Sequence, residues 1–283
     1  MMSEEHATDR PRNEMDPQTA PPVLIPDQRR ESILRELRRH GVLSVHQLTE
    51  MFQCSHMTVR RDISVLEQEG RAYSVPGGVR IASQLSTEPS HQVKAIVELA
   101  QKRAIAAHAA TLLHAGMTVY LDAGTTTLSI VPHIIALQDM TVITNDFPVV
   151  EALVEAPHVN VIHIGGVLDH PNRSSVGPLA AATLRQLASD VAFVSSSSWD
   201  LQRGLTTPSA PKVEVKRAAM ETASRKILVT TSSKYGTFGT YRIAGLAQFD
   251  QIITDDALAD AAAHRLQDAG IDISLVSVPG TSR

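Results

Sequence analysis

The stretch His56–Gly78 constrains the fold most, because it reads as a short helix followed at once by a tight, glycine-ended ribbon. Apolar residues recur on one helical face at positions i, i+4 and i+7, namely Val59, Ile63 and Leu66. Arg61 points away from this face, and Gly70 ends the helix. The adjacent pair Arg60 and Arg61 is then either a solvated surface or a basic surface built for a ligand. The flanking sequence decides between these readings.

Two more short helices are predicted just before this stretch. The first has Asp27 as its cap and is stopped by Gly41. The second begins at Ser44, which forms a capping-box pattern with the glutamine three residues later. After the third helix, Arg71–Ile81 reads as two short strands around a Pro-Gly-Gly turn. Three short helices and a ribbon predict a winged helix-turn-helix domain over residues 27–81.

A short helix with a polar outer face fits the major groove of DNA, which is about 12 Å wide. Residues 27–80 contain nine arginines, no lysine and seven acidic residues, although the whole chain has a net charge of −4. Arginine suits bidentate contacts with phosphates and base edges. On the pattern alone, the alternative is a small three-helix protein-interaction module.

We expect the recognition helix to contact base edges and phosphates, two serines to cap helices toward the DNA backbone, and two wing residues to anchor the ribbon on DNA. The predicted DNA-binding residues are Ser44, Ser55, His56, Thr58, Arg60, Arg61, Tyr73 and Arg80. The expected partner is double-stranded operator DNA.

The rest of the chain divides by composition. Residues 1–26 are acidic and proline-rich without periodicity, so we expect disorder. Residues 82–94 are polar and read as a linker. Residues 95–283 begin with a long alanine-rich helix, Ala95–His114, and then alternate strand and helix patterns, which predicts a mainly parallel sheet covered on both faces. The predicted strands are Thr118–Asp122, Thr141–Thr144, Val159–Ile164, Val191–Ser195, Ile227–Thr231, Gln251–Thr254 and Ile273–Val278.

Small and polar residues follow several of these strands, where open α/β sheets bind their ligands. Asp122–Thr127 offers a glycine turn, threonine hydroxyls and a helix N-terminus that favours an anion. It matches neither a Walker loop nor a dinucleotide fingerprint, and taken alone it is equally a threonine-capped turn without a ligand. Similar clusters at other strand ends predict one shared anion pocket. Its predicted residues are Asp122, Gly124, Thr125, Thr126, Thr144, Asn145, Gly165, Gly166, Arg173, Gly177 and Lys234.

The segment SVHQLTEMFQCSHMTVRRDISVLEQEG resembles the N-terminal helix-turn-helix of the DeoR family of bacterial transcriptional repressors. The positions in register are Leu48, Phe52, Ser55, Thr58, Val59, Arg60, Arg61, Asp62, Leu66, Glu67, Gly70, Gly77 and Gly78. The resemblance continues through a C-terminal sensor domain, in Asp122–Thr126, Thr144–Asn145, Gly165–Gly166, Gly177, Gly204–Thr207 with Glu214 and Lys216, and Ser233–Gly236.

This resemblance implies an α/β sensor related in fold to ribose-5-phosphate isomerase and CoA-transferase-like enzymes. It also implies that a phosphorylated sugar or sugar acid changes the affinity for operator DNA, and hence repression of a carbohydrate or sugar-acid catabolic operon. Symmetric operators imply a homodimer or higher homo-oligomer. Three residues depart from the family pattern, since Ser195 and Ser198 replace glycines and Thr231 replaces an aspartate. The serines favour a more oxidised ligand, such as an acid-sugar phosphate.

Other classes find little support. No run of eighteen apolar residues or secretory signal occurs, and Cys54 is the only cysteine, so we expect a cytoplasmic protein. The twelve histidines lack metal-ligand spacing, and we expect no metal, no cofactor and no catalytic residue. The rival interpretation is a sugar-phosphate isomerase with an appended DNA-binding head. The candidate carboxylates Asp122, Asp146, Asp200 and Glu214 show no evident acid–base partner.

Overall fold

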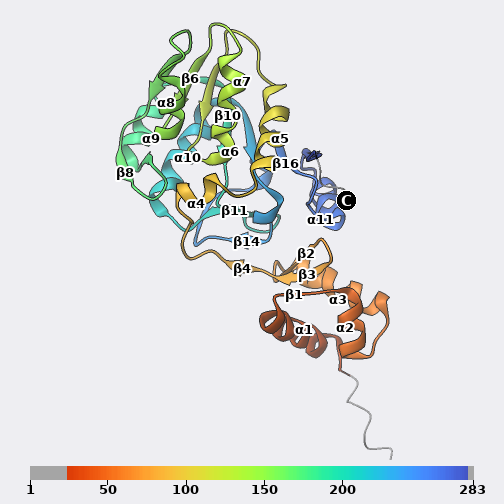
Figure 1. Ribbon diagram of the computed structural model, residues 1–283. Coiled ribbons are helices and arrows are strands. Elements are labelled where there is room, and N and C mark those ends of the chain that lie inside the picture. Colours follow the sequence, from red (N-terminus) through yellow and green to blue (C-terminus); the bar gives the residue numbers. More distant parts are fainter. Residues whose placement is uncertain (1–23, 280–283) are drawn as a thin grey trace, which may run out of the picture.

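The computed structural model describes residues 24–279. Most of the segment predicted to be disordered, residues 1–26, lies outside this range. Figure 1 shows a small N-terminal domain below a larger α/β domain, with strands β2 and β3 of the small domain facing the larger one. The chain therefore has the predicted order, a helix-turn-helix followed by a parallel α/β domain.

The N-terminal domain contains the three predicted helices and a three-stranded antiparallel sheet in the order β1-β3-β2. The elements are α1 (Pro26–His40), β1 (Val42–Leu43), α2 (Val45–Phe52), α3 (His56–Gln68), β2 (Ala72–Val75) and β3 (Gly78–Ile81). The sequence prediction missed β1, which adds an edge to the wing. The prediction of Asp27 as the cap of α1 is wrong. Ile25 is the N-cap, because Pro26 fills the first helical position, where a missing N–H costs nothing.

Local chemistry fixes how these helices begin and end. The capping box is confirmed, since the Ser44 hydroxyl accepts from the Gln47 N–H at 3.1 Å and Gln47 accepts from the Ser44 N–H at 2.8 Å. The backbone of Gly41 has φ 77°, which a glycine adopts without steric cost after α1. The predicted face of α3 is confirmed as core, because Val59 and Leu66 are fully buried.

The larger domain is built on one seven-stranded, wholly parallel sheet in the order β17-β16-β13-β10-β5-β6-β7. Its strands are β5 (Thr118–Leu121), β6 (Thr141–Thr144), β7 (Asn160–His163), β10 (Ser189–Ser195), β13 (Ala223–Val229), β16 (Gln251–Asp255) and β17 (Ile273–Val276). All seven predicted strands are confirmed. The strand order reverses between β5 and β10, so their carboxyl ends form the topological switch point at which such sheets bind ligands.

Helices cover both faces of this sheet, as predicted (Figure 1). The buried side chains of α5, α7 and α8 pack on one face, and those of α9, α10 and α11 pack on the other. The helices are α4 (His91–Ala95), α5 (Leu99–Ala110), α6 (Thr125–Leu128), α7 (Val131–Ile135), α8 (Phe147–Leu153), α9 (Pro178–Leu184), α10 (Ala210–Thr222) and α11 (Asp260–Asp268).

The predicted helix Ala95–His114 is confirmed over Leu99–Ala110, but its predicted start is wrong, because the chain breaks between α4 and α5 where Glu98 has φ 55°. Residues 82–94, read as a linker, are tied to the larger domain through β4 (Ser83–Gln84), which pairs with β14 (Thr237–Phe238). Short additional elements were not predicted: β8 (Val167–Asp169), β9 (Ser174–Val176), β11 (Ser198–Asp200), β12 (Gly204–Thr207), β15 (Tyr241–Ala244), η2 (Ser232–Lys234) and η3 (Leu246–Gln248). Between residues 24 and 279, no helix is both long and apolar enough to span a bilayer.

Candidate functional site

The outer face of α3 carries two arginines that the rest of the described chain does not engage. Arg60 and Arg61 are exposed, and neither guanidinium group has an ion pair or hydrogen bond with residues 24–279. In α1, Arg29 lies 2.5 Å from Asp62 and Arg39 lies 3.3 Å from Glu36, whereas Arg38 is exposed and its guanidinium group also lacks a partner within the described residues. The guanidinium groups of Arg60 and Arg61 are therefore available for phosphate or base contacts.

The hydroxyl groups predicted to lie at DNA are engaged in capping. The Ser55 hydroxyl accepts from the Thr58 N–H at 3.2 Å and lies 2.9 Å from the Thr58 hydroxyl, which fixes the start of α3. Ser44 fixes the start of α2 in the same way. His56, which follows Ser55 in the first turn of α3, is exposed. These residues orient the recognition helix through its N-terminus, and a direct contact with DNA remains a prediction.

The two wing residues face the sensor domain instead of an open DNA surface, which corrects the prediction for both. Tyr73 is 1% exposed, and its ring packs edge-on against Tyr235 at 5.4 Å between centroids. Arg80 donates to the backbone carbonyls of Ser233, at 3.1 Å, and Tyr235. The wing is therefore an interdomain contact in this structure, because aromatic packing and two carbonyl acceptors hold its side chains on η2 and the residue after it.

Further bonds fasten the DNA-binding domain to the sensor. Arg265 of α11 donates to both oxygens of Glu67 on α3, at 2.5 and 2.6 Å. Arg203 donates to the Gly70 carbonyl at 3.0 Å and to the Tyr73 hydroxyl at 3.1 Å. These bonds connect α11 and the residues before β12 directly to the recognition helix and the wing. A movement of either sensor element therefore changes the position of the recognition helix.

At the switch point of the sheet, Asp122 is the centre of a buried polar network. It is 1% exposed and accepts from the Ser195 N–H and hydroxyl, both at 2.9 Å, and from the Lys216 ammonium group. Lys216 also donates to the Ser195 carbonyl at 2.9 Å. Gly124 is required beside this network, because a Cβ atom there would lie 2.9 Å from the Cβ of Ser195. Ser195 thus has a structural use, bridging β5 and β10.

Two further polar residues complete the network beside β6. Asn145 accepts from the Tyr120 hydroxyl at 2.9 Å and from the Ala123 N–H at 3.1 Å, and donates to the Ser175 carbonyl at 2.8 Å. Asp146 accepts from the Gly124 N–H at 3.3 Å through Oδ2, while its buried Oδ1 has no hydrogen-bond partner among residues 24–279. Burial raises the pKa of Asp146 to about 7.

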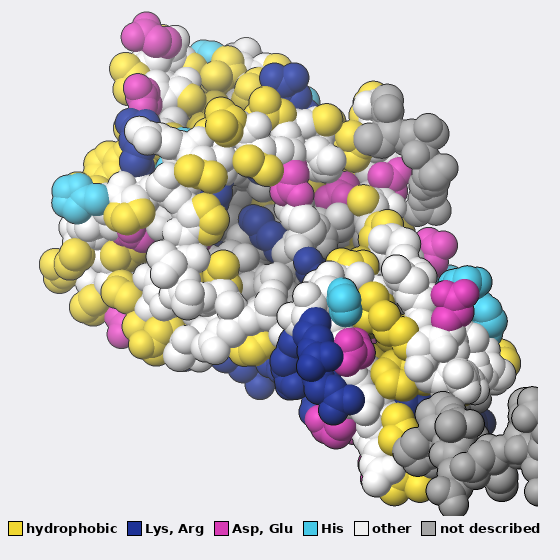
Figure 2. Space-filling model, turned by 60° about the horizontal axis from the view of Figure 1, so that its bottom comes forward, with side chains coloured by type: hydrophobic (Ala, Val, Ile, Leu, Met, Phe, Trp, Pro, Cys, Tyr) yellow, Lys and Arg dark blue, Asp and Glu magenta, His cyan; other side chains and the backbone are white. Residues whose placement is uncertain are grey.

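A cavity of 250 Å³ lies beside this network and is rich in lysine. Lys234 donates to the Ser196 carbonyl at 2.7 Å, and burial, with the nearby Lys94 charge, lowers the pKa of Lys234 to about 8. Figure 2 shows basic side chains set inside a hollow of the surface. The residues lining the cavity are Leu85, Glu88, Pro89, Val93, Lys94, Val97, Glu98, Lys102, Thr125, Ser196, Ser197, Ser233, Lys234 and Thr237. Its charge suits a small anion.

Sequence reasoning missed most of the charged groups at this cavity. Glu88 lies between Lys94, at 2.6 Å, and Lys212, and it also lines a smaller adjoining recess with Asp122, Asn145 and Lys216. No local pattern signals this cluster, because Glu88 and Lys212 are separated by 124 residues in the chain. Lys216 matched the family pattern, which was a signal for including it in the site.

Several residues predicted to bind the ligand line neither the cavity nor the recess. Thr144 donates its hydroxyl to the Leu121 carbonyl at 2.7 Å, joining adjacent strands. Gly166 lets β9 and α9 approach, since a Cβ atom there would lie 2.8 Å from the Val176 carbonyl oxygen of β9 and 3.1 Å from the Ala180 Cβ of α9, and Gly177 precedes α9 with φ 88°. Arg173 pairs with the exposed Glu151 at 3.1 Å. Gly165 and Thr126 likewise lie away from the lysine cavity, whereas Thr125 and Lys234 line the cavity and Asp122 and Asn145 line the adjoining recess.

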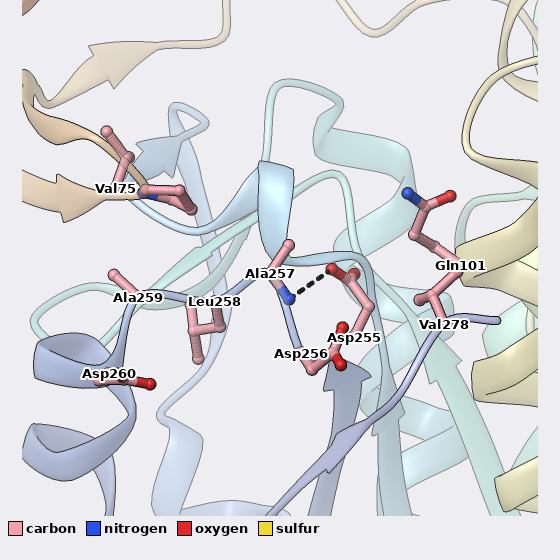
Figure 3. A pocket seen from close by; sticks show the side chains of 10 residues that line it. Val75, Gln101, Asp255, Asp256, Ala257, Leu258, Ala259, Asp260 and Val278 are labelled. Atoms are coloured by element: carbon pink, nitrogen blue, oxygen red, sulfur yellow. Dashed lines mark hydrogen bonds between the residues drawn. The ribbon is translucent and has the colours of Figure 1, made fainter. Parts of the chain in front are cut away.

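A second cavity, of 530 Å³, lies between the wing and the sensor domain (Figure 3). Val75 of β2 forms one side, and Gln101, Val278 and the turn Asp255–Asp260 form the others. Three carboxylates in that turn make the cavity unsuited to an anion. Nor does it hold a metal centre, since no group of three His, Cys, Asp or Glu residues in the described part of the chain is placed for one. The lysine cavity is therefore the better candidate for ligand binding.

Comparison with known proteins agrees with this architecture. Residues 29–85 match the DeoR-like helix-turn-helix domain, and residues 97–256 match the DeoR C terminal sensor domain. The chain is 44% identical over 243 residues to the uncharacterized HTH-type transcriptional regulator YgbI of Escherichia coli K12, covering 86% of this chain and 95% of that protein. It is 34% identical to the transcriptional repressor AccR of Agrobacterium fabrum, covering 80% of this chain and 88% of that protein.

Among solved structures, a D-ribose-5-phosphate isomerase in complex with phospho-erythronic acid aligns with 47% of this chain and 52% of its own length. The identity is 15% and the TM-score 0.35, and a likeness at this level says nothing about function.

The fold and the two sites define a DNA-binding transcriptional regulator with a small-molecule sensor domain. The chain belongs to the DeoR family of helix-turn-helix transcriptional regulators. Its relatives are transcriptional regulators and not enzymes, so the isomerase alternative falls away.

Proposed function

We propose that the protein represses a carbohydrate or sugar-acid catabolic operon and that a phosphorylated sugar or acid-sugar metabolite, bound in the lysine cavity, changes its affinity for operator DNA. The observation that carries this proposal is the cavity itself. Lys94, Lys102 and Lys234 line a space of 250 Å³, which suits a small metabolite. Hydroxyl groups of Thr125, Ser196 and Ser197 lie in the same wall and suit a polyhydroxylated ligand.

DNA recognition is proposed to lie on α3. Arg61 reads base edges and Arg60 contacts phosphate, with His56 and Thr58 at the start of the same helix. The exposure of both arginines, and their lack of partners within residues 24–279, support this assignment. A two-fold operator then requires a homo-oligomer, which sedimentation of the purified protein measures.

The turn η2 offers a physical route between ligand and DNA. Lys234 reaches into the lysine cavity, while the carbonyls of Ser233 and Tyr235 accept from Arg80 of the wing. An anion that draws Lys234 away from the Ser196 carbonyl therefore moves the residues that hold the wing. Only a ligand with different affinities for two domain arrangements shifts their populations, and this contact supplies such a difference.

Two measurements test the proposal. Purified protein should bind its own upstream DNA with an affinity that falls steeply with salt, because arginines displace counterions from phosphates. A thermal-shift screen against phosphorylated sugars and sugar acids should identify a ligand that stabilises the folded protein, and that ligand should change the DNA affinity. DNA binding that does not depend on salt, or a stabilising ligand without effect on DNA, would contradict the proposal.

A further inference from the structure

We infer that Glu88 is a built-in competitor for the effector: its carboxylate occupies the anion position between Lys94 and Lys212, and a phosphate group of the ligand displaces it and releases the segment that joins the two domains. This inference rests on the proposed function and adds the regulation of the same site. The phosphate group concerned is that of the phosphorylated metabolite in the proposed function.

The contacts of Glu88 resemble those of a bound anion. One oxygen accepts from Lys94 at 2.6 Å and the other accepts from Lys212, so that each oxygen has its own ammonium group. Burial alone would raise the pKa of Glu88, but Lys212 and Lys94 outweigh it and lower the pKa to about 2. The group is thus a permanent carboxylate at physiological pH.

The positive charge of the lysines around Glu88 is larger than the charge that one carboxylate neutralises. Lys216 and Lys234 are close enough to Lys94 for their charges to act on one another, and Lys102 adds a further charge. The carboxylates facing this group are Glu88 itself, Glu98, Asp122, Asp146, which is close enough to Lys94 for their charges to interact, and Asp169, which lies 3.6 Å from Lys212. Asp122 is held by Lys216 and Ser195, and Glu98 accepts from the Thr231 hydroxyl at 2.9 Å. Glu88 alone bridges two of the lysines and belongs to a connecting segment. A phosphate monoester carries nearly two negative charges and outcompetes a single carboxylate there.

Displacement of Glu88 affects the connection between the two domains, because of where Glu88 lies in the chain. It lies between β4 and α4, in the segment that connects the wing to the sensor. The other bonds that fasten this segment to the sensor include Leu85 N–H to the Phe238 carbonyl and His91 N–H to the Pro171 carbonyl, both at 2.7 Å, the Lys94 ammonium group to Asn172, and the Thr231 hydroxyl to Glu98 at 2.9 Å. Loss of the two ion pairs of Glu88 loosens residues 85–98, and with them β4, which follows the wing directly.

The test measures binding of inorganic phosphate to the full chain by calorimetry, comparing wild type with Glu88→Gln. If Glu88 occupies the site about nine-tenths of the time, its neutralisation raises the apparent phosphate affinity about tenfold. The matched control is Glu221→Gln, which removes the same charge from an exposed pair with Arg185, and its affinity should stay within about twofold of wild type. Lys212→Met should abolish phosphate binding. Equal or weaker phosphate binding by Glu88→Gln would overturn the inference.

Two further arms complete the test. Acetate in place of phosphate should bind Glu88→Gln at least about tenfold more weakly, since it carries one charge, and equal binding overturns the phosphate assignment. Hydrogen exchange of residues 85–98 should speed up when phosphate binds wild type, and should already be fast in Glu88→Gln. If exchange does not change, displacement is refuted. The increase in melting temperature caused by phosphate is also measured for each variant relative to the same variant without phosphate. The comparison therefore remains valid if Glu88→Gln is less stable than wild type.

The outcome also separates this inference from the proposed function. Binding of the upstream DNA is measured with the same variants. A gain of phosphate affinity in Glu88→Gln, with DNA affinity insensitive to every phosphorylated ligand, would sustain the competitor role and refute effector control. The reverse pattern, ligand-sensitive DNA binding with no gain of phosphate affinity, would refute the competitor role alone.

Discussion

Arg265 of the sensor helix α11 donates two hydrogen bonds, of 2.5 and 2.6 Å, to the carboxylate of Glu67 on the recognition helix α3. Glu67 is 5% exposed and also accepts from the Ser74 N–H of the wing, at 2.7 Å. One carboxylate thus joins the recognition helix, the wing and the sensor. Because the acceptor is charged and buried, its loss of partners carries a desolvation penalty.

Arg265→Ala should lower the free energy of unfolding by about 2 kcal/mol, because it leaves the buried Glu67 carboxylate without its charged partner. Urea denaturation followed by circular dichroism measures this. Arg185→Ala is the control, since it breaks the exposed pair with Glu221 and should cost less than about 0.5 kcal/mol. Equal effects of the two substitutions would show that the Glu67–Arg265 pair does not stabilise the interdomain contact.

Lys216→Met should destabilise the sensor domain by about 3 kcal/mol, because Asp122 would remain as a buried charge with only the neutral donors of Ser195 and Tyr120. The double variant Asp122→Asn with Lys216→Met should recover part of this loss, since it removes the charge as well as its partner. Thermal unfolding of the wild type and the three variants gives the coupling energy. Strictly additive effects would contradict the buried pair.

Arg61→Ala should weaken binding to the specific operator about tenfold or more, as expected for the loss of a bidentate base contact worth about 1–3 kcal/mol. Arg60→Ala should instead reduce the slope of log affinity against log salt concentration by about one, and it should weaken binding to all DNA sequences equally. Electrophoretic mobility shifts at several salt concentrations distinguish the two. Both variants should keep the ligand-induced rise in melting temperature, and unchanged DNA affinity for Arg61→Ala would mean that α3 does not read the operator.

Binding of a phosphorylated ligand should weaken as the pH rises above about 8. Burial, with the charges of Lys94 and Lys102 set against Glu88 and Glu98, lowers the pKa of Lys234 to about 8 in the free protein. A bound anion favours the charged amine, so affinity is full below pH 8 and falls by up to about tenfold per pH unit above it. In Lys234→Arg this fall should disappear, because the guanidinium stays charged. Calorimetric titrations from pH 7 to 9 test both statements.

Sequence patterns predicted the local architecture well. The cap at Ser44, the buried face of α3 and the seven strands of the large sheet each follow from residues within one element or the next. A run of apolar residues between turns predicts a buried strand, and its carboxyl end predicts where polar residues meet. Asp122, Thr125, Asn145 and Lys234 were predicted in this way, and they line the lysine cavity or its adjoining recess.

Where the patterns failed, the partner lies far away in the chain. Tyr73 and Arg80 are polar residues of a wing, and nothing local reveals that Tyr235 and Ser233 cover them. Gly166 and Gly177 look like ligand-binding turns, but Gly166 serves the close approach of β9 and α9, and Gly177 supplies the positive φ angle that precedes α9.

The amino-acid sequence by itself determined the three N-terminal helices, the seven main strands and their parallel arrangement, because helix caps and apolar periodicity act between neighbouring residues. Only the tertiary structure decided that the wing lies against the sensor and that Glu88 enters a lysine cluster. These arrangements join residues more than a hundred positions apart, such as Glu88 with Lys212 and Glu67 with Arg265. Their free energy comes from desolvated charges brought together by folding, which no local pattern records.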